Sequence, residues 1–151
     1  MVGGSNPSAP TREPVGHPAV VGIDDVLAAS RAGVHRLTPA ELVAAAGRGA
    51  LVVDIRTEAH RRVQGEFPGA LVIDRTVLEW RLDPACPYRI PEATGTDLEV
   101  VVVCRHGYSS SLAAASLRAI GLHRATDLAG GVEAWLAAGL PMSDRAADVR
   151  E

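Results

Sequence analysis

The chain has 151 residues and a formal net charge of −3 at pH 7, which is enough chain for one domain with a substantial core. Its pI near 5.9 gives no electrostatic basis for binding nucleic acid or an anionic membrane. Two cysteines are too few for a disulfide scaffold, and no apolar run is long enough to span a bilayer. We therefore expect a cytoplasmic protein with no nucleic-acid and no membrane partner.

The composition changes along the chain and predicts its domain organisation. Residues 1–18 are rich in Pro, Gly and Ser and lack both packing residues and the apolar stretch of a signal peptide. We expect a disordered leader over residues 1–18, a single domain over residues 19–144 and a C-terminal tail over residues 145–151.

Two short helices are predicted at the start of the domain. Residues 23–32 form the first, with Asp24 or Asp25 as its N-cap. The second has Thr38 as its N-cap, and Glu41 three residues later completes the pattern of a capping box. The proline after Thr38 suits the first helical position.

Short apolar segments then alternate with helical ones. Four of these segments are expected to be strands: residues 51–54, 70–73, 100–103 and 125–128. Residues 100–103 are four consecutive valines, which is typical of a strand covered on both faces. This alternation predicts an α/β domain with a mainly parallel sheet, in which functional sites form beyond the carboxyl ends of the strands.

Cys104 comes directly after the valine strand and just before a predicted helix. Gly107 allows a sharp turn, and Ser109 to Ser111 are candidate N-caps for a helix over residues 112–120. The free N–H groups of such a loop and helix start favour an anion, and a thiolate is one. The alternative is that Cys104 is a small apolar residue that ends a core strand.

Three separated segments resemble the rhodanese-like (thiosulfate sulfurtransferase-like) domain family over roughly residues 37–141. They are Asp54-Ile55-Arg56 with the turn Gly65-Glu66-Phe67-Pro68-Gly69-Ala70, the loop Val100 to Ser110, and Leu128-Ala129-Gly130-Gly131-Val132-Glu133-Ala134-Trp135. The resemblance implies a five-stranded, mainly parallel sheet flanked by helices on both faces. It also implies that Cys104 takes up a sulfane sulfur as a persulfide and passes it to a thiophilic acceptor.

The chemistry of the residues agrees with this implied role. A thiolate at Cys104 can attack the sulfane sulfur of a donor such as thiosulfate, and the covalent intermediate divides the transfer into two steps that need no cofactor. The acceptor is either a small thiophile or a small protein. The expected anion-binding loop consists of Arg105, His106, Gly107, Tyr108, Ser109 and Ser110, and Asp54 and Arg56 are expected to support it as a buried polar pair.

The loop departs from the family pattern Cys-x-x-Gly-x-Arg, because Ser109 stands where the arginine is usual. Arg105 is a candidate replacement, with His106 and Tyr108 shaping access of the donor. The absence of this arginine is also compatible with a second hypothesis, in which the chain is a rhodanese-like binding or regulatory module without catalytic activity.

Three further roles have less support in the sequence. A cysteine phosphatase or arsenate reductase would need an arginine where Ser110 stands. Cys86, in the long connection after residue 83, is a candidate resolving thiol for Cys104. No metal site is expected, because Cys104 and His106 offer only two ligands.

Overall fold

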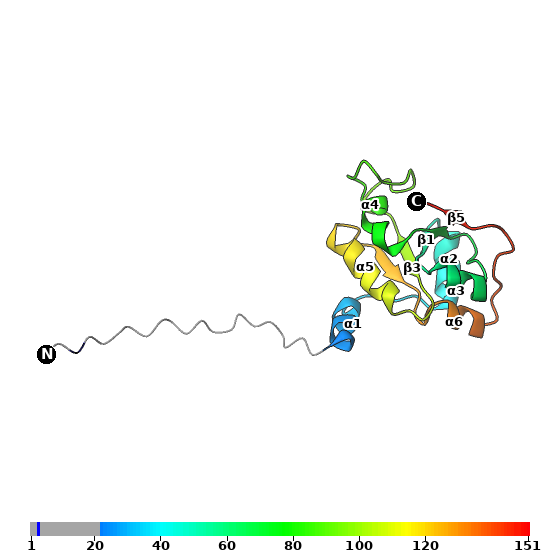
Figure 1. Cartoon of the computed structure of the whole chain (residues 1–151), viewed down its shortest axis with the longest axis horizontal. Helices are drawn as coiled ribbons and strands as arrows, with labels where there is room; N and C mark the ends of the chain where they lie inside the picture. Colours follow the sequence, from blue (N-terminus) through cyan, green and yellow to red (C-terminus); the bar gives the residue numbers. More distant parts are fainter. Residues whose placement is uncertain (1–2, 4–21) are drawn as a thin grey trace.

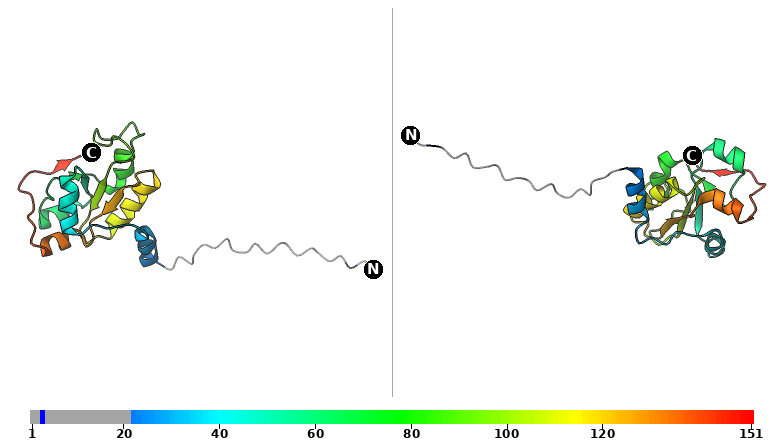
Figure 2. Two further views of the ribbon diagram at one scale, coloured as in Figure 1. Left: turned by 180° about the vertical axis from the view of Figure 1, so that it is seen from behind. Right: turned by 90° about the horizontal axis from the view of Figure 1, so that it is seen from below.

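The structure is a computed structural model that describes residue 3 and residues 22–151. The predicted leader over residues 1–18 lies outside the described residues, apart from Gly3. The described chain forms one sheet with helices on both of its faces (Figures 1 and 2). The predicted α/β fold class is therefore confirmed.

The elements follow one another in an alternating order. The helices are α1 (Ile23–Arg31), α2 (Pro39–Gly47), α3 (Glu58–Gln64), the 3₁₀ turn η1 (Arg75–Val77), α4 (Leu78–Leu82), α5 (Ser109–Ala119) and α6 (Gly131–Ala137). The strands are β1 (Leu51–Asp54), β2 (Leu71–Val72), β3 (Val100–Val103), β4 (Ala125–Asp127) and β5 (Asp148–Val149).

The five strands lie in the order β4-β3-β1-β2-β5, and every pairing between them is parallel. The register pairs Leu51 with Val100 and Asp54 with Val103, so β1 and β3 end level with each other. This level ending brings the residues that follow each strand, Arg56 and Cys104 among them, to one edge of the sheet.

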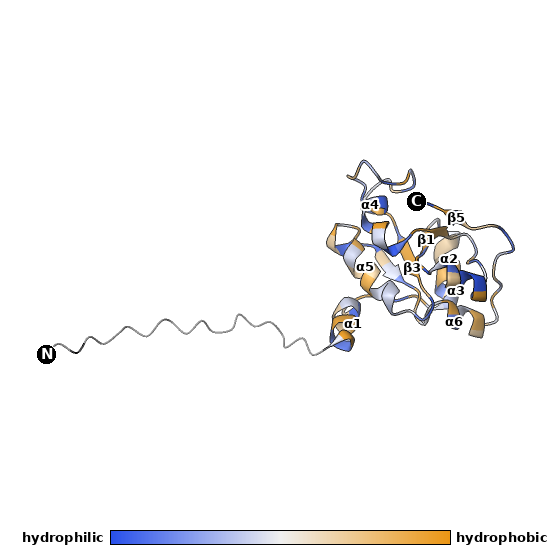
Figure 3. Cartoon of the chain, in the orientation of Figure 1, coloured by the Kyte–Doolittle hydropathy of each residue, from blue (hydrophilic) through white to orange (hydrophobic). Residues whose placement is uncertain are grey.

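The valines of β3 supply both faces of the core. Val100 and Val102 belong to the layer between the sheet and helices α4 and α5, whereas Val101 and Val103 face α2 and α6. All four are fully buried, which agrees with the prediction from their unbroken apolar run. Apolar colour gathers on the central strands in Figure 3, and polar colour covers outer segments such as α3.

Of the two predicted helix starts, one is confirmed and one is wrong. Thr38 and Glu41 form the complete capping box of α2. Helix α1 instead has Gly22 as its N-cap with no side-chain cap, while Asp24 and Asp25 lie inside its first turn. Acidic side chains are favourable in that turn because the helix dipole is positive there, which produces much the same sequence pattern as a cap.

The C-terminal segment 145–151, predicted to be a tail, contributes strand β5. Leu71 and Val72 of β2 pair with Asp148 and Val149, and the Arg150 amide donates to the Val72 carbonyl at 2.8 Å. The Arg150 guanidinium also binds Glu92 and Asp148, and these carboxylates raise its pKa. A two-residue exposed strand has no apolar pattern, so the pairing comes from the open edge of β2 rather than from a sequence signal.

The start of α6 is fastened to the chain after β3. The amides of Val132 and Glu133 donate to the carbonyls of Cys104 and Arg105 at 2.9 and 3.1 Å. Gly131, with φ +62°, lies so close that a Cβ atom on it would be 2.4 Å from the Cys104 carbonyl oxygen. Only glycine fits at this position, both for its backbone conformation and for the space.

Replacing Gly131 with Ala should therefore destabilise the fold far more than replacing Gly69 with Ala. Gly69 has a similar φ of +67° but open space around it, so the two variants share a backbone strain of about 1–2 kcal/mol. The clash at Gly131 should add about 1–3 kcal/mol, measured by urea unfolding. Equal losses in the two variants would contradict the close packing of α6 on the loop.

Candidate active site at the carboxyl end of the sheet

Cys104 is the first residue after β3, and its side chain is buried with its sulfur facing the loop amides. The Gly107 and Ser110 amides donate to Sγ at 3.1 and 3.4 Å. The thiol itself is 3.2 Å from the Ser110 hydroxyl oxygen, to which it donates. Three polar contacts on one sulfur are unlike the surroundings of a cysteine that merely fills space. The two amide donors are oriented to stabilise a negative charge on the sulfur.

Cys104 also lines a pocket of about 240 Å³. One wall carries Arg56, Thr57 and His60, which follow β1, and the other is formed by the loop residues 104–106, 108 and 109. A larger hollow of about 420 Å³ includes Gly33 and Arg124 and lies at the other end of β4, away from the sulfur. The smaller pocket is the one with a candidate nucleophile.

The first turn of α5 is tied to β4 by two serine hydroxyls. Ser110 and Ser111 were predicted as candidate N-caps along with Ser109, but the N-cap of α5 is Tyr108 and has no side-chain cap. Their hydroxyls instead donate to the Asp127 carboxylate at 2.7 and 2.9 Å. Asp127 ends β4 and is buried, so it needs these partners. The Ser110 hydroxyl thus links the carboxylate to the sulfur of Cys104.

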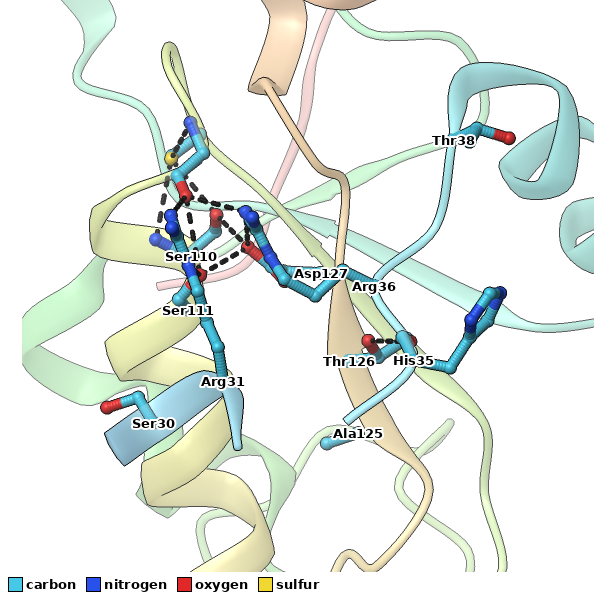
Figure 4. A network of polar contacts seen from close by, with 12 residues as sticks. Ser30, Arg31, His35, Arg36, Thr38, Ser110, Ser111, Ala125, Thr126 and Asp127 are labelled. Atoms are coloured by element: carbon cyan, nitrogen blue, oxygen red, sulfur yellow. Dashed lines mark hydrogen bonds and ion pairs between the residues drawn. The ribbon is translucent and has the colours of Figure 1, made fainter. Parts of the chain in front are cut away.

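Two arginines from before α2 complete this network (Figure 4). Arg36 binds both oxygens of Asp127 at 2.9 and 3.0 Å, and it donates to the Gly107 carbonyl at 2.8 Å. Arg31 donates to the same carbonyl at 2.7 Å and to Ser111 Oγ at 3.0 Å. Neither guanidinium lines the pocket, so both hold the loop from the side away from it.

Sequence reasoning missed Arg31, Arg36 and Asp127. The segment that carries the arginines lies beside β4 because the Leu37 amide donates to the Asp127 carbonyl at 3.0 Å and Leu37 forms a bridge with Leu128. The one available signal was Asp127 itself, an acidic residue at the end of a short buried strand, which requires a cationic or hydrogen-bonding partner.

Asp54 and Arg56 form the expected buried pair, and both side chains are fully inaccessible. Arg56 Nη2 lies 2.8 Å from Asp54 Oδ2 and 2.9 Å from the Gly65 carbonyl, and its Nη1 donates to Gln64 at 3.2 Å. The pair ties the end of β1 to the turn after α3 and shapes the pocket wall.

The remaining loop side chains lie at the mouth of the pocket. Arg105 is half-exposed, with Nε 3.4 Å from Glu133 Oε1, so its charge is shared with a carboxylate of α6. His106, Tyr108 and Ser109 are exposed, and the Arg31 guanidinium lies 5.8 Å from the centre of the Tyr108 ring. Within the part of the chain that the structure describes, Ser109 makes no side-chain contact that would replace an arginine fork within the loop.

Three further features can be reported for the described part of the chain. No cluster of three or more His, Cys, Asp or Glu side chains that could hold a metal occurs there. Cys86 is a free, half-buried thiol in the connection after α4. Over the same residues, none of the helices has the length and apolar character to cross a bilayer.

Comparison with known proteins gives the family. Residues 38–138 match the model of the Rhodanese-like domain. The chain belongs to the rhodanese-like family. The match begins after Arg31 and Arg36, so the two arginines that hold the loop precede the part of this rhodanese-like protein that the family model covers.

Two curated relatives of this rhodanese-like protein are sulfurtransferases by name. A sulfurtransferase of Allochromatium vinosum is 38% identical over 92 residues, which are 61% of this chain and 77% of that one. The thiosulfate sulfurtransferase GlpE of Stutzerimonas stutzeri is 31% identical over 103 residues, 66% of this chain and 83% of that one. These relatives place the chain in a rhodanese-type sulfurtransferase family.

Solved structures agree on the fold. A Rhodopseudomonas palustris protein of unknown function, described as a possible tyrosine phosphatase, superposes with a TM-score of 0.72 and 32% identity over 81% of this chain and 94% of that one. The human single-domain sulfurtransferase TSTD1 gives a TM-score of 0.57 and 26% identity over 70% of this chain and 97% of that one.

The buried pair at the pocket wall gives a test of what holds the site together. Replacing Arg56 with Leu leaves the Asp54 carboxylate buried without its partner, which should lower the free energy of unfolding by about 3–5 kcal/mol. Arg62 pairs with Glu58 at the exposed surface, so Arg62→Leu should cost less than about 1 kcal/mol. Urea unfolding measures both, and a mild effect of Arg56→Leu would mean that Asp54 finds other partners.

Proposed function

We propose that this rhodanese-like protein is a sulfurtransferase in which the Cys104 thiolate accepts a sulfane sulfur from a small anionic donor such as thiosulfate. The observation that carries the proposal is the pair of backbone amides, from Gly107 and Ser110, that converge on Sγ beside a pocket. The names of the relatives from Allochromatium vinosum and Stutzerimonas stutzeri support the same activity.

The transfer proceeds in two balanced steps. The Cys104 thiolate attacks the outer sulfur of thiosulfate, the sulfur–sulfur bond of the donor breaks, and sulfite leaves with the bonding electron pair. A thiophilic acceptor then attacks the terminal sulfur of the persulfide, and the electron pair returns to the cysteine as thiolate. Cyanide as acceptor gives thiocyanate. No metal or organic cofactor enters either step.

The loop amides stabilise the Cys104 thiolate, which begins the first step and is regenerated in the second. The Gly107 and Ser110 N–H groups already point at Sγ, so they need no rearrangement when negative charge forms there. The pocket volume of about 240 Å³ suits a small inorganic donor better than a bulky organic one, because drug-sized ligands need about 300–1,000 Å³.

Incubation with thiosulfate should add one sulfur atom to the protein, detected by intact mass spectrometry and removed by cyanide. The adduct should be absent in Cys104→Ser and fully retained in Cys86→Ser, the matched control at the other thiol. Absence of the adduct in the parent protein over a range of donor concentrations would favour the competing reading, a rhodanese-like binding or regulatory module that does not turn over.

Arg105 is the residue at the pocket mouth best placed to attract an anionic donor. Arg105→Ala should raise KM for thiosulfate about two- to fivefold with little change in kcat, because an exposed charge contributes less than about 1 kcal/mol. Glu133→Gln releases Arg105 from its carboxylate partner and should lower KM. Steady-state kinetics of thiocyanate formation measures both, and a KM that moves in the same direction in the two variants would refute this role.

The structural neighbour from Rhodopseudomonas palustris brings a second candidate, phosphate-ester hydrolysis. That chemistry needs an arginine fork facing a tetrahedral anion above the cysteine, and Ser109 and Ser110 cannot supply one. Arg31 and Arg36 hold the loop from the side away from the pocket. We therefore expect no hydrolysis of p-nitrophenyl phosphate, and a turnover lost in Cys104→Ser would establish the phosphatase instead.

A further inference from the structure

We propose that Arg31 and Arg36 are positioning residues of the catalytic loop, and that together they place behind it a surplus positive charge, which the loop does not carry at Ser109. The inference rests on the proposed function, because it assigns these arginines a role in preparing the Cys104 sulfur for reaction. It extends the active site to a segment that precedes the family-matched residues 38–138.

Two guanidinium groups converge on one carbonyl of the loop. Arg31 and Arg36 both donate to the Gly107 carbonyl, at 2.7 and 2.8 Å, while the Gly107 amide donates to Cys104 Sγ at 3.1 Å. Gly107 has φ +80°, and a Cβ atom there would lie 2.7 Å from the Gly130 amide nitrogen. Two guanidinium groups on one carbonyl thus hold a tightly packed residue in the orientation that points its N–H at the sulfur.

The charges of the two arginines and of Asp127 do not cancel. Arg36 is neutralised by the Asp127 carboxylate, which it binds through both oxygens. Arg31 is half-buried and, among the described residues, pairs with no carboxylate. Two guanidinium charges and one carboxylate charge, +2 and −1, leave a formal surplus of +1 behind the loop. A positive charge close to a thiol favours its thiolate form.

Other charged groups also surround the sulfur, and the test variants leave them unchanged so that only the charge at Arg31 is altered. They are Arg105 and His106 on the loop, Arg56 and His60 across the pocket, Asp54 next to Arg56, and Glu133 on α6. Arg56 is paired with Asp54 and Arg105 with Glu133, so neither adds an unbalanced charge. Within residues 22–151, Arg31 is the guanidinium beside the loop for which no carboxylate partner is found.

The segment that carries the arginines is firmly placed, as the proposal requires. Arg118 of α5 donates to the Ser30 carbonyl at the end of α1 at 2.6 Å. Further along, Thr126 of β4 donates to the His35 carbonyl at 2.7 Å, and the Leu37 amide donates to the Asp127 carbonyl at 3.0 Å. Helix α1 lies beside α5 in Figure 1, and Arg31 at the end of α1 reaches the catalytic loop through the Gly107 carbonyl.

Arg31 is the residue to test, because removing Arg36 would leave Asp127 buried without its partner and confuse a charge effect with unfolding. The experiment follows alkylation of Cys104 by iodoacetamide against pH, by intact mass spectrometry, in full-length protein that carries Cys86→Ser. Alkylation reports the thiolate directly and needs no sulfur donor.

Arg31→Gln should move the midpoint of the alkylation profile upward by roughly 0.5–1 pH unit, and should slow persulfide formation at pH 7 about three- to tenfold. Arg31→Lys, which keeps the charge, should restore the midpoint. Arg124→Gln is the matched control: it removes one positive charge at the opposite end of β4, and its profile should equal that of the parent. Arg31→Met, which keeps the aliphatic stem, takes the place of Arg31→Gln if the latter does not fold.

An unchanged midpoint in the neutral Arg31 variants would overturn the inference and leave Arg31 a structural residue. A merely structural role would lower the extent or rate of persulfide formation at every pH without moving the profile. The two proposals can be refuted independently. If the parent protein forms no persulfide, the proposed sulfur transfer is refuted. If the midpoint of its Cys104 alkylation profile still depends on Arg31, the proposed role of Arg31 is supported.

Discussion

The candidate active site depends on the direction in which the peptide groups of one short loop point. The carbonyls of Cys104, Arg105 and Gly107 are all bound by donors outside the loop, the first two by amides of α6 and the third by guanidinium groups. With these carbonyls held outward, the Gly107 and Ser110 amides face the sulfur. A buried thiolate needs such donors, because burial alone would favour the neutral thiol.

This arrangement follows from the parallel sheet. Strands β1, β3 and β4 end at one edge, so the loop after β3 lies between the chain that follows β1 and the chain that leads into α6. Gly131 lets α6 start against the loop, since any side chain there would meet the Cys104 carbonyl. On the other side, Asp127 at the end of β4 gathers two serine hydroxyls and a guanidinium. The apolar core therefore fixes the strands, and polar contacts at the strand ends fix the loop that carries Cys104.

Much of this could be predicted from local sequence and some could not. The valine run predicts β3, and the glycine and proline positions predict the turns. Asp54 and Arg56, two charged residues at the exit of a buried strand, predict a buried polar pair, and all of these signals are local. Strand β5 could not be found, since it exists only because β2 has an open edge. Arg31 and Arg36 were missed for a related reason: their contacts reach loop and strand residues more than 70 positions away, and no local pattern reports them.

The serines of the first turn of α5 illustrate how one sequence pattern serves two purposes. Serine before a helix usually caps it, but Ser110 and Ser111 lie inside the first turn, where their hydroxyls reach Asp127 instead. Asp127 in turn attracts Arg36, and Arg36 reaches the Gly107 carbonyl. A carboxylate at the end of β4 therefore makes it favourable to place a guanidinium under the loop. In a loop organised in this way, a small exposed residue such as Ser109 can occupy the position where the family pattern Cys-x-x-Gly-x-Arg has arginine, because the loop is held from its other side.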